Sequence, residues 1–221
     1  MVRRPEEAGN LWLARALWEV GAVRFGDFTI GRSTVHSPVY INVRRLISRP
    51  RILKRASLVM AREVQAELAR LHPTYHPFQL LAGVPLGGLH IATALSLTSN
   101  IPMIYAHPRL ESNRHYLIEG HYEPDQMVLI IDDLITSGGS VLETASVLSQ
   151  EGLQVRDALV LIDRGEGASG RLRQHGYNLH SILSLEVMLN YYLSTQRIDQ
   201  NLHRKCIEYI ERKRKEYAGN S

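Results

Sequence analysis

Residues 128–140, VLIIDDLITSGGS, place two carboxylates directly after an apolar run and directly before a loop of hydroxyl side chains and glycines. The apolar run predicts a buried strand, and the residues after the loop have the spacing of a helix. Successive backbone N–H groups in such a loop can surround an anion, and the N-terminus of the following helix adds a favourable field. The stretch therefore predicts a phosphate-binding loop.

The predicted phosphate loop contains Thr136, Ser137, Gly138, Gly139 and Ser140. Its glycines allow close approach of the backbone to a ligand, and its hydroxyl groups supply further donors. Asp132 and Asp133 would repel a phosphate unless they face sugar hydroxyls or a magnesium ion, so the combination indicates a phosphorylated ribose. The alternative is a glycine-rich turn that binds nothing. A Walker loop is excluded because the Gly-Lys-Ser/Thr signature is missing.

The elements that must position this loop alternate along the chain. Apolar strands are predicted at residues 78–83, 101–106, 127–133, 155–163 and 180–187, and helices at 51–71, 87–100, 140–152 and 167–176. This alternation is typical of βαβ units and a parallel sheet, in which ligands bind beyond the carboxyl ends of the strands. Upstream, Asn10 is expected to cap a helix that ends at Gly21, and strands at 25–30 and 37–44 flank a polar turn.

Composition narrows the class of protein. The chain has 221 residues, a formal net charge of +4 and a single cysteine, Cys206. We therefore expect no disulfide framework and no cysteine-based metal site, and the histidines lack the spacing of zinc ligands. No apolar run has transmembrane length, and the first residues do not resemble a signal peptide, so a cytoplasmic protein is expected without a membrane partner.

The C-terminal segment differs from the rest of the chain. Residues 196–221 predict a basic, partly amphipathic helix, separate from a domain at 1–195. The favoured interpretation is a solvated terminal helix, although it could also dock or bind a protein partner. Nucleic-acid binding is not expected, because no recognition motif accompanies the charge.

Several segments, in order, resemble the orotate phosphoribosyltransferases, which belong to the type I phosphoribosyltransferase family. They are FGDFTI…SPVYINVR, LLAGVPLGGLHIATALS, VLIIDDLITSGGS and HSILSLEVML, and the resemblance covers nearly the whole chain. It is especially similar to the transferase half of bifunctional UMP synthase. It implies an α/β fold with a central parallel sheet flanked by helices, a small N-terminal hood, and a homodimer.

The resemblance also implies roles for particular residues. Asp132 and Asp133 would contact the ribose of phosphoribosyl pyrophosphate (PRPP), and the phosphate loop would hold its 5-phosphate. The pyrophosphate loop would contain Val84, Pro85, Leu86 and Gly87, flanked by Gly83 and Gly88. Magnesium would arrive with PRPP. Arg164 would pair with the carboxylate of orotate, which suits a bidentate guanidinium, and Arg32 would replace a hood lysine that contacts substrate.

Two segments depart from the family. In the catalytic loop, residues 106–113 read AHPRLESN, and Leu110 stands where the catalytic lysine is expected. His107, Arg109 and Arg114 keep this region basic and are the candidate catalytic residues. Gly87 replaces a lysine that some members carry in the pyrophosphate loop. Losing a cation that stabilises a transition state should cost on the order of 10²–10³ in turnover.

Two functional hypotheses follow. The first is an orotate phosphoribosyltransferase that converts orotate and PRPP to orotidine 5'-monophosphate and pyrophosphate in de novo pyrimidine synthesis. The second is a PRPP-binding protein with little or no catalysis that regulates or assembles with others. A transferase with another acceptor base is a third idea, which Arg164 disfavours. The chain stops before any decarboxylase, so the second reaction of UMP synthase is not expected.

Overall fold

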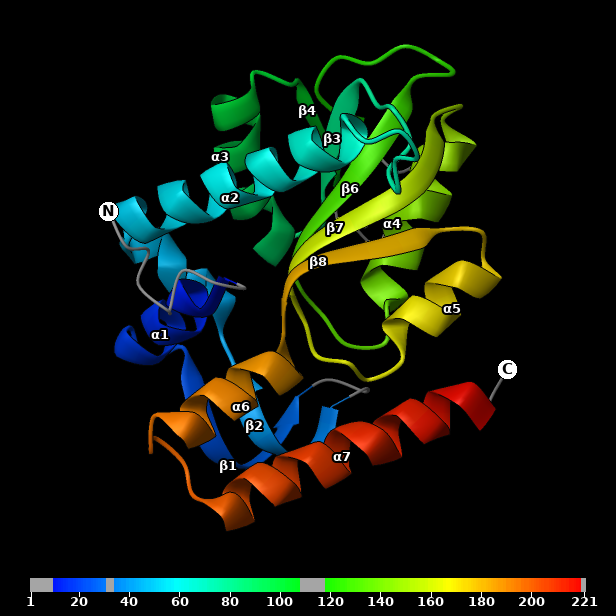
Figure 1. The fold of residues 1–221 in the computed structure, drawn as a ribbon. Helices are drawn as coiled ribbons and strands as arrows, with labels where there is room; N and C mark the ends of the chain where they lie inside the picture. The colour runs from blue at the N-terminus through cyan, green and yellow to red at the C-terminus, as the bar shows by residue number, and fades with distance from the viewer. Residues whose placement is uncertain (1–9, 31–33, 108–117, 220–221) are drawn as a thin grey trace.

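The computed structural model describes residues 10–30, 34–107 and 118–219, and a six-stranded sheet forms its centre (Figure 1). The strand order is β5-β4-β3-β6-β7-β8, and all neighbours are parallel except β5, which is antiparallel to β4. The strands are β3 (Leu80–Gly83), β4 (Met103–Ala106), β5 (Ile118–Glu119), β6 (Met127–Ile135), β7 (Gln154–Asp163) and β8 (Asn178–Ser184). The predicted α/β fold with a central parallel sheet is confirmed.

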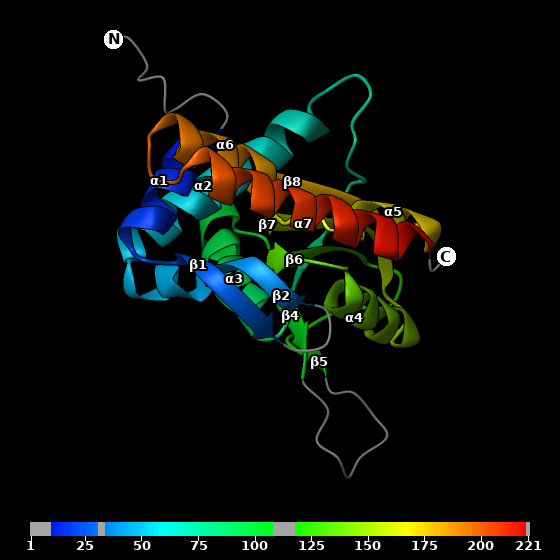
Figure 2. The same cartoon turned by 90° about the horizontal axis from the view of Figure 1, so that it is seen from below.

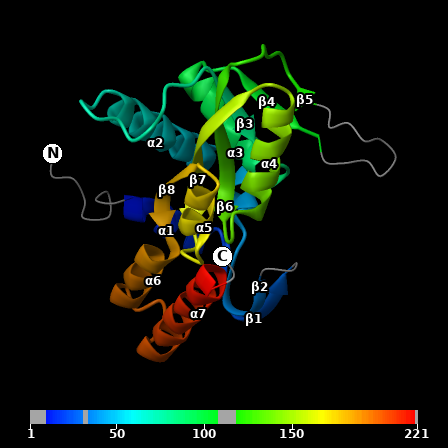
Figure 3. The same ribbon diagram turned by 90° about the vertical axis from the view of Figure 1, so that its right-hand side faces the viewer.

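Helices cover both faces of this sheet, as Figure 3 shows. They are α2 (Pro50–Leu68), α3 (Gly87–Ser99), α4 (Gly139–Gln150) and α5 (Ala168–Gln174). Along β6, Leu129 and Ile131 belong to the core with α2 and α3, whereas Val128 and Ile130 belong to the core with α4 and α5. Side chains of a strand alternate between faces, so burial on both faces explains the unbroken apolar run before Asp132.

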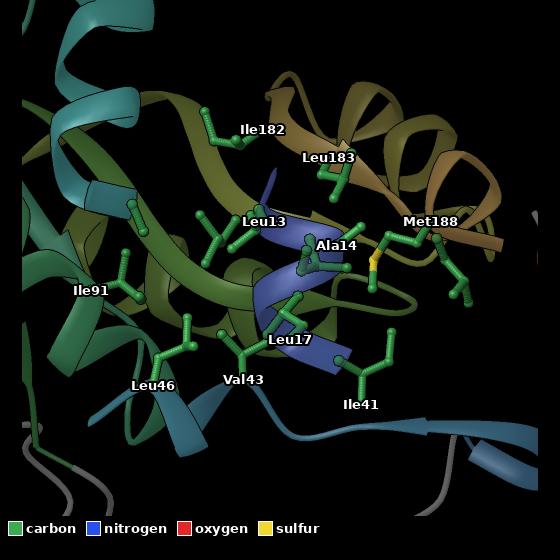
Figure 4. Packing of buried hydrophobic residues seen from close by; sticks show 14 of the residues in the cluster. Leu13, Ala14, Leu17, Ile41, Val43, Leu46, Ile91, Ile182, Leu183 and Met188 are labelled. Carbon is green, nitrogen blue, oxygen red and sulfur yellow. The ribbon is translucent and has the colours of Figure 1, made fainter. Parts of the chain in front are cut away.

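A smaller hood packs on the same core. It contains α1 (Leu11–Glu19), the antiparallel pair β1 (Val23–Ile30) and β2 (Thr34–Ile41), the 3-10 helix η2 (Val43–Ser48) and α6 (Leu185–Ser194). In Figure 4, Leu13 and Leu17 of α1 lie among Ile41, Val43 and Met188. One continuous core thus joins the N-terminal segment to the helix that follows the last strand.

Three local expectations are corrected. Asn10 adopts a left-handed backbone with φ of 63° and does not cap α1; its side-chain amide donates to the carbonyl of Ile182 at 3.3 Å. The strand expected at 180–187 ends at Ser184, whose hydroxyl accepts the N–H of Val187 and starts α6, as serine does at helix N-caps. The strand expected at 37–44 ends at Ile41, because the chain turns into η2.

The C-terminal helix α7 (Gln200–Gly219) is docked rather than solvated. Cys206, Tyr209 and Ile210 are almost completely buried, and they recur at the spacing of one helix face. Figure 2 shows α7 lying alongside the body of the molecule, where it contacts β2, α5 and α6. The division of the chain at residue 195 and a protein partner for the tail both stay predictions.

In the described ranges, no helix combines the length and the apolar content that crossing a bilayer requires.

Candidate active site

A cleft lies beyond the carboxyl ends of β3 and β6. Its volume is about 310 Å³, and a second cleft of about 390 Å³ adjoins it. The first is lined by residues that include Arg44, Val84, Pro85, Leu86, Gly87, Asp132, Asp133, Thr136, Ser140 and Arg164. The second shares five of these and adds Ala106 and His107. Segments predicted from distant parts of the sequence therefore meet in one place.

The two aspartates end β6 inside this cleft. Asp132 is 6% exposed, and burial together with the neighbouring charge of Asp133 raises the pKa of Asp132 well above its usual range. Burial also raises the pKa of Asp133, against an opposing hydrogen bond from Asp132 and the positive charge of Arg44. Carboxylates that are desolvated in this way need hydroxyl donors or a cation to stabilise their charge. The donor set therefore fits a ribose diol and a magnesium ion.

The pyrophosphate loop is pressed against the aspartates. A Cβ atom at Gly87 would fall on the Asp133 carboxylate, 2.6 Å from its Cγ, and one at Gly88 would lie 2.5 Å from the carbonyl oxygen of Ile131. The N–H of Val84 donates to the same carbonyl at 2.9 Å. Only glycine leaves room for this contact, so Gly87 has a steric role besides being a missing cation.

The phosphate loop is supported from behind by α5. Gly138 adopts a left-handed backbone with φ of 80°, and a Cβ there would collide with Leu172 of α5. The Nη1 of Arg171 donates to the carbonyl of Ser137 at 3.2 Å. Ser137 is buried, while Gly139 and Ser140 are exposed at the start of α4. Arg171 is a supporting residue that sequence reasoning missed, because nothing local to 167–176 indicated this contact.

Arg164 follows β7 and is buried, with 3% of its surface exposed. Its Nε donates to Glu166 at 2.6 Å, Nη1 to the carbonyl of Val39 at 3.2 Å, and Nη2 to the hydroxyl of Ser37 at 3.0 Å. It thus ties the hood strand β2 to the end of the sheet and lines the first cleft. Glu166 is a second residue that sequence reasoning missed.

The remaining candidates divide into two groups. His107 lines the second cleft, whereas Arg32, Arg109, Leu110 and Arg114 lie outside the described residues. Arg44, which sequence reasoning did not single out, lines both clefts and acts on Asp133. Its only local signal is a basic residue directly after a strand of the hood. Within the described part of the chain, no cluster of three or more His, Cys, Asp or Glu side chains could hold a metal ion.

Comparisons with known proteins agree with this geometry. No protein-family model matches the sequence. The chain is 37% identical over 192 residues to an orotate phosphoribosyltransferase of Chlamydia caviae, covering 83% of this chain and 86% of that protein. It is 40% identical over 181 residues to the uridine 5'-monophosphate synthase of Bos taurus, covering 80% of this chain and 35% of that one.

Among solved structures, UMP synthase of Leishmania donovani superposes with a TM-score of 0.81 at 30% identity. The match covers 94% of this chain and 43% of the Leishmania chain. The chain therefore spans well under half of each bifunctional relative but most of the bacterial enzyme.

Proposed function

Because the chain belongs to the orotate phosphoribosyltransferase family, we propose that it transfers the phosphoribosyl group of PRPP to orotate in pyrimidine biosynthesis. The observation that carries this proposal is the cleft itself. Asp132, Asp133, the phosphate loop and the pyrophosphate loop surround one space, with Arg164 at its wall. A phosphorylated ribose with a pyrophosphate leaving group requires this combination of an anion loop, diol acceptors and a second anion loop.

The reaction is a displacement at the anomeric carbon of the ribose. A ring nitrogen of orotate forms the new bond, the bond from carbon to pyrophosphate oxygen breaks, and its electron pair leaves with pyrophosphate. Asp132 and Asp133 would accept hydrogen bonds from the ribose hydroxyls and stabilise positive charge on the ring. Arg164 would orient orotate through its carboxylate. When bound with PRPP, magnesium would neutralise charge on the leaving group, with the Asp132 and Asp133 pair beside it.

The catalytic loop sets the rate in this proposal. Leu110 stands at the place of the family's catalytic lysine, and we propose that this replacement slows turnover rather than abolishing it. His107, Arg109 and Arg114 would supply part of the missing charge around the leaving group. Of these, His107 lies at the second cleft, directly after β4.

The test is loss of orotate absorbance with the purified protein, PRPP and magnesium. We expect turnover in the wild type and none in an Asp132→Asn, Asp133→Asn double variant. Leu110→Lys should raise kcat by on the order of 10²-fold, because it returns a cation to the developing charge. The matched control is Asp125→Asn, which changes an exposed aspartate far from the cleft and should leave the rate unchanged.

A wild type that binds PRPP in calorimetry but shows no loss of orotate would contradict this function. That outcome would instead support the PRPP-binding regulatory protein.

A further inference from the structure

The C-terminal helix α7 packs directly over the loop that carries Arg164. Tyr209 is 4% exposed and lies on the buried face of α7. Farther along the helix, the Nε of Arg214 donates to the carbonyl of Gly165 at 3.1 Å. Helix α7 also contacts β2, the strand whose Ser37 and Val39 receive the Arg164 guanidinium. Figure 1 shows α7 passing below the hood strands towards α5. The helix is thus part of the surroundings of Arg164.

The guanidinium of Arg164 retains donors for a ligand. An arginine has five N–H donors, one on Nε and two on each Nη. The contacts to Glu166, Val39 and Ser37 use one donor on each nitrogen. One N–H on each Nη is left by these contacts, which matches a bidentate pair with a single carboxylate. Arg164 therefore pairs with Glu166 and can still receive the carboxylate of a base.

Binding a second carboxylate creates an electrostatic problem at Glu166. Glu166 is fully buried, and its Oε2 atom lacks a hydrogen-bond partner among the described residues. A ligand carboxylate on Arg164 would bring another negative charge close to this atom, in surroundings that screen poorly. The repulsion would weaken ligand binding unless a donor stabilised the Glu166 carboxylate.

Tyr209 provides such a donor. Its hydroxyl is buried and, within the described residues, also has no hydrogen-bond partner. Burial and the negative charge of Glu166 raise the pKa of Tyr209, while the positive charge of Arg164 opposes the rise. The phenol therefore stays protonated and close to both members of the ion pair. An unpaired donor and an unpaired acceptor face the same buried pair.

We propose that α7 forms the back wall of the orotate subsite and that Tyr209 is a positioning residue there. Its hydroxyl donates to Glu166 when the carboxylate of the base binds Arg164, and this donation relieves the repulsion between the two carboxylates. The inference rests on the proposed role of Arg164 in binding orotate.

The experiment measures the affinity for two nucleotides by calorimetry with the full-length protein. Orotidine 5'-monophosphate and uridine 5'-monophosphate differ by the carboxylate alone, so the ratio of their dissociation constants reports the Arg164 subsite. We expect Tyr209→Phe to reduce this ratio about fivefold, the effect of one lost hydrogen bond of ~1 kcal/mol, with uridine 5'-monophosphate affinity unchanged. A merely structural hydroxyl with no partner would not produce this selective loss.

The matched control is Tyr191→Phe. The Tyr191 hydroxyl is also buried and without a partner among the described residues, but it lies on α6 beside Arg197. This variant should keep the wild-type ratio, and both variants should keep the wild-type unfolding temperature.

Three results separate the possibilities. If Tyr209→Phe weakens both nucleotides equally, or neither, the inference is wrong although the transferase proposal stands. If the wild type binds both nucleotides equally, Arg164 does not receive the carboxylate, and the inference fails with it. If orotate turnover is absent but the ratio is high and falls in Tyr209→Phe, the proposed reaction fails while the positioning role is supported.

Discussion

At the scale of single residues, the cleft combines groups that are costly to bury. Asp132 is desolvated beside another carboxylate, which raises its pKa, and the described cation that acts on the pair is Arg44. Such an arrangement sacrifices stability to keep acceptors directed at a ligand. Gly87 belongs to the same arrangement, because the contact between the pyrophosphate loop and Asp133 leaves no room for a side chain.

Gly87→Ala should therefore weaken PRPP binding. The added methyl group would displace the Asp133 carboxylate, and overpacking of this kind costs ~1–3 kcal/mol, or about tenfold in affinity. Calorimetric titration with PRPP measures the effect. Gly170→Ala is the control, since a Cβ at Gly170 in α5 meets nothing within 4 Å and its backbone is not left-handed. Unchanged PRPP affinity in Gly87→Ala would show that Asp133 is free to move.

At the scale of elements, a polar cluster joins β7, β8 and the segment before β3. Asp157 of β7 is buried and accepts hydrogen bonds from the side chains of His76, Asn178 and His180 at 2.8–3.1 Å. Tyr75 stacks on His180 with ring centroids 3.6 Å apart. Burial alone would raise the pKa of Asp157, but these hydrogen bonds outweigh it and lower the pKa to about 2. The cluster therefore favours the ionised carboxylate in the folded state.

Asp157→Asn should lower the free energy of unfolding at pH 7 by about 2 kcal/mol. The folded pKa of Asp157 lies below the unfolded value of about 3.9, so its contribution is present above pH 4 and is lost as pH falls towards 2. Urea denaturation at pH 7, 5 and 3 should show the difference from wild type shrinking with acidity. A difference that stays constant with pH would rule out this linkage, and exposed Asp125→Asn should show none.

At the scale of the whole molecule, hood, sheet and α7 share a core, and one helix of the sheet layer keeps an apolar face outside it. Leu86 and Leu97 are 62% and 83% exposed. They lie just before and within α3, three helical turns apart on one side. Leu86 also lines both clefts, so a second copy seated on this face would lie beside the active site. The family resemblance implies such a homodimer, which we retain as a proposal.

Leu97→Glu should convert the dimer to a monomer in analytical ultracentrifugation, because a charge would be placed in an apolar interface. The wild type should sediment at twice the mass of one chain. Leu71→Glu is the control, since Leu71 is 94% exposed in the segment after α2 and away from α3. A wild type that sediments as a monomer at micromolar concentration would contradict the homodimer.

The sequence by itself determined the features that depend on neighbouring residues. The apolar run before Asp132, the glycines and hydroxyls of residues 136–140 and the alternation of strands and helices are local patterns, so they predicted the parallel sheet and the anion loop. Residue 164 was also identified correctly as a candidate for the site, although its role stays a proposal.

Only the tertiary structure decided the contacts between distant segments. Pairing of Arg164 with Glu166 and β2, support of Ser137 by Arg171, and the docking of α7 depend on which surfaces meet when the chain folds. The helix 200–219 has a basic composition that is typical of a solvated helix, yet a narrow stripe with Cys206, Tyr209 and Ile210 buries it. A stripe this narrow gives a weak periodic signal, and its burial follows from the apolar surface that the hood and sheet present to it.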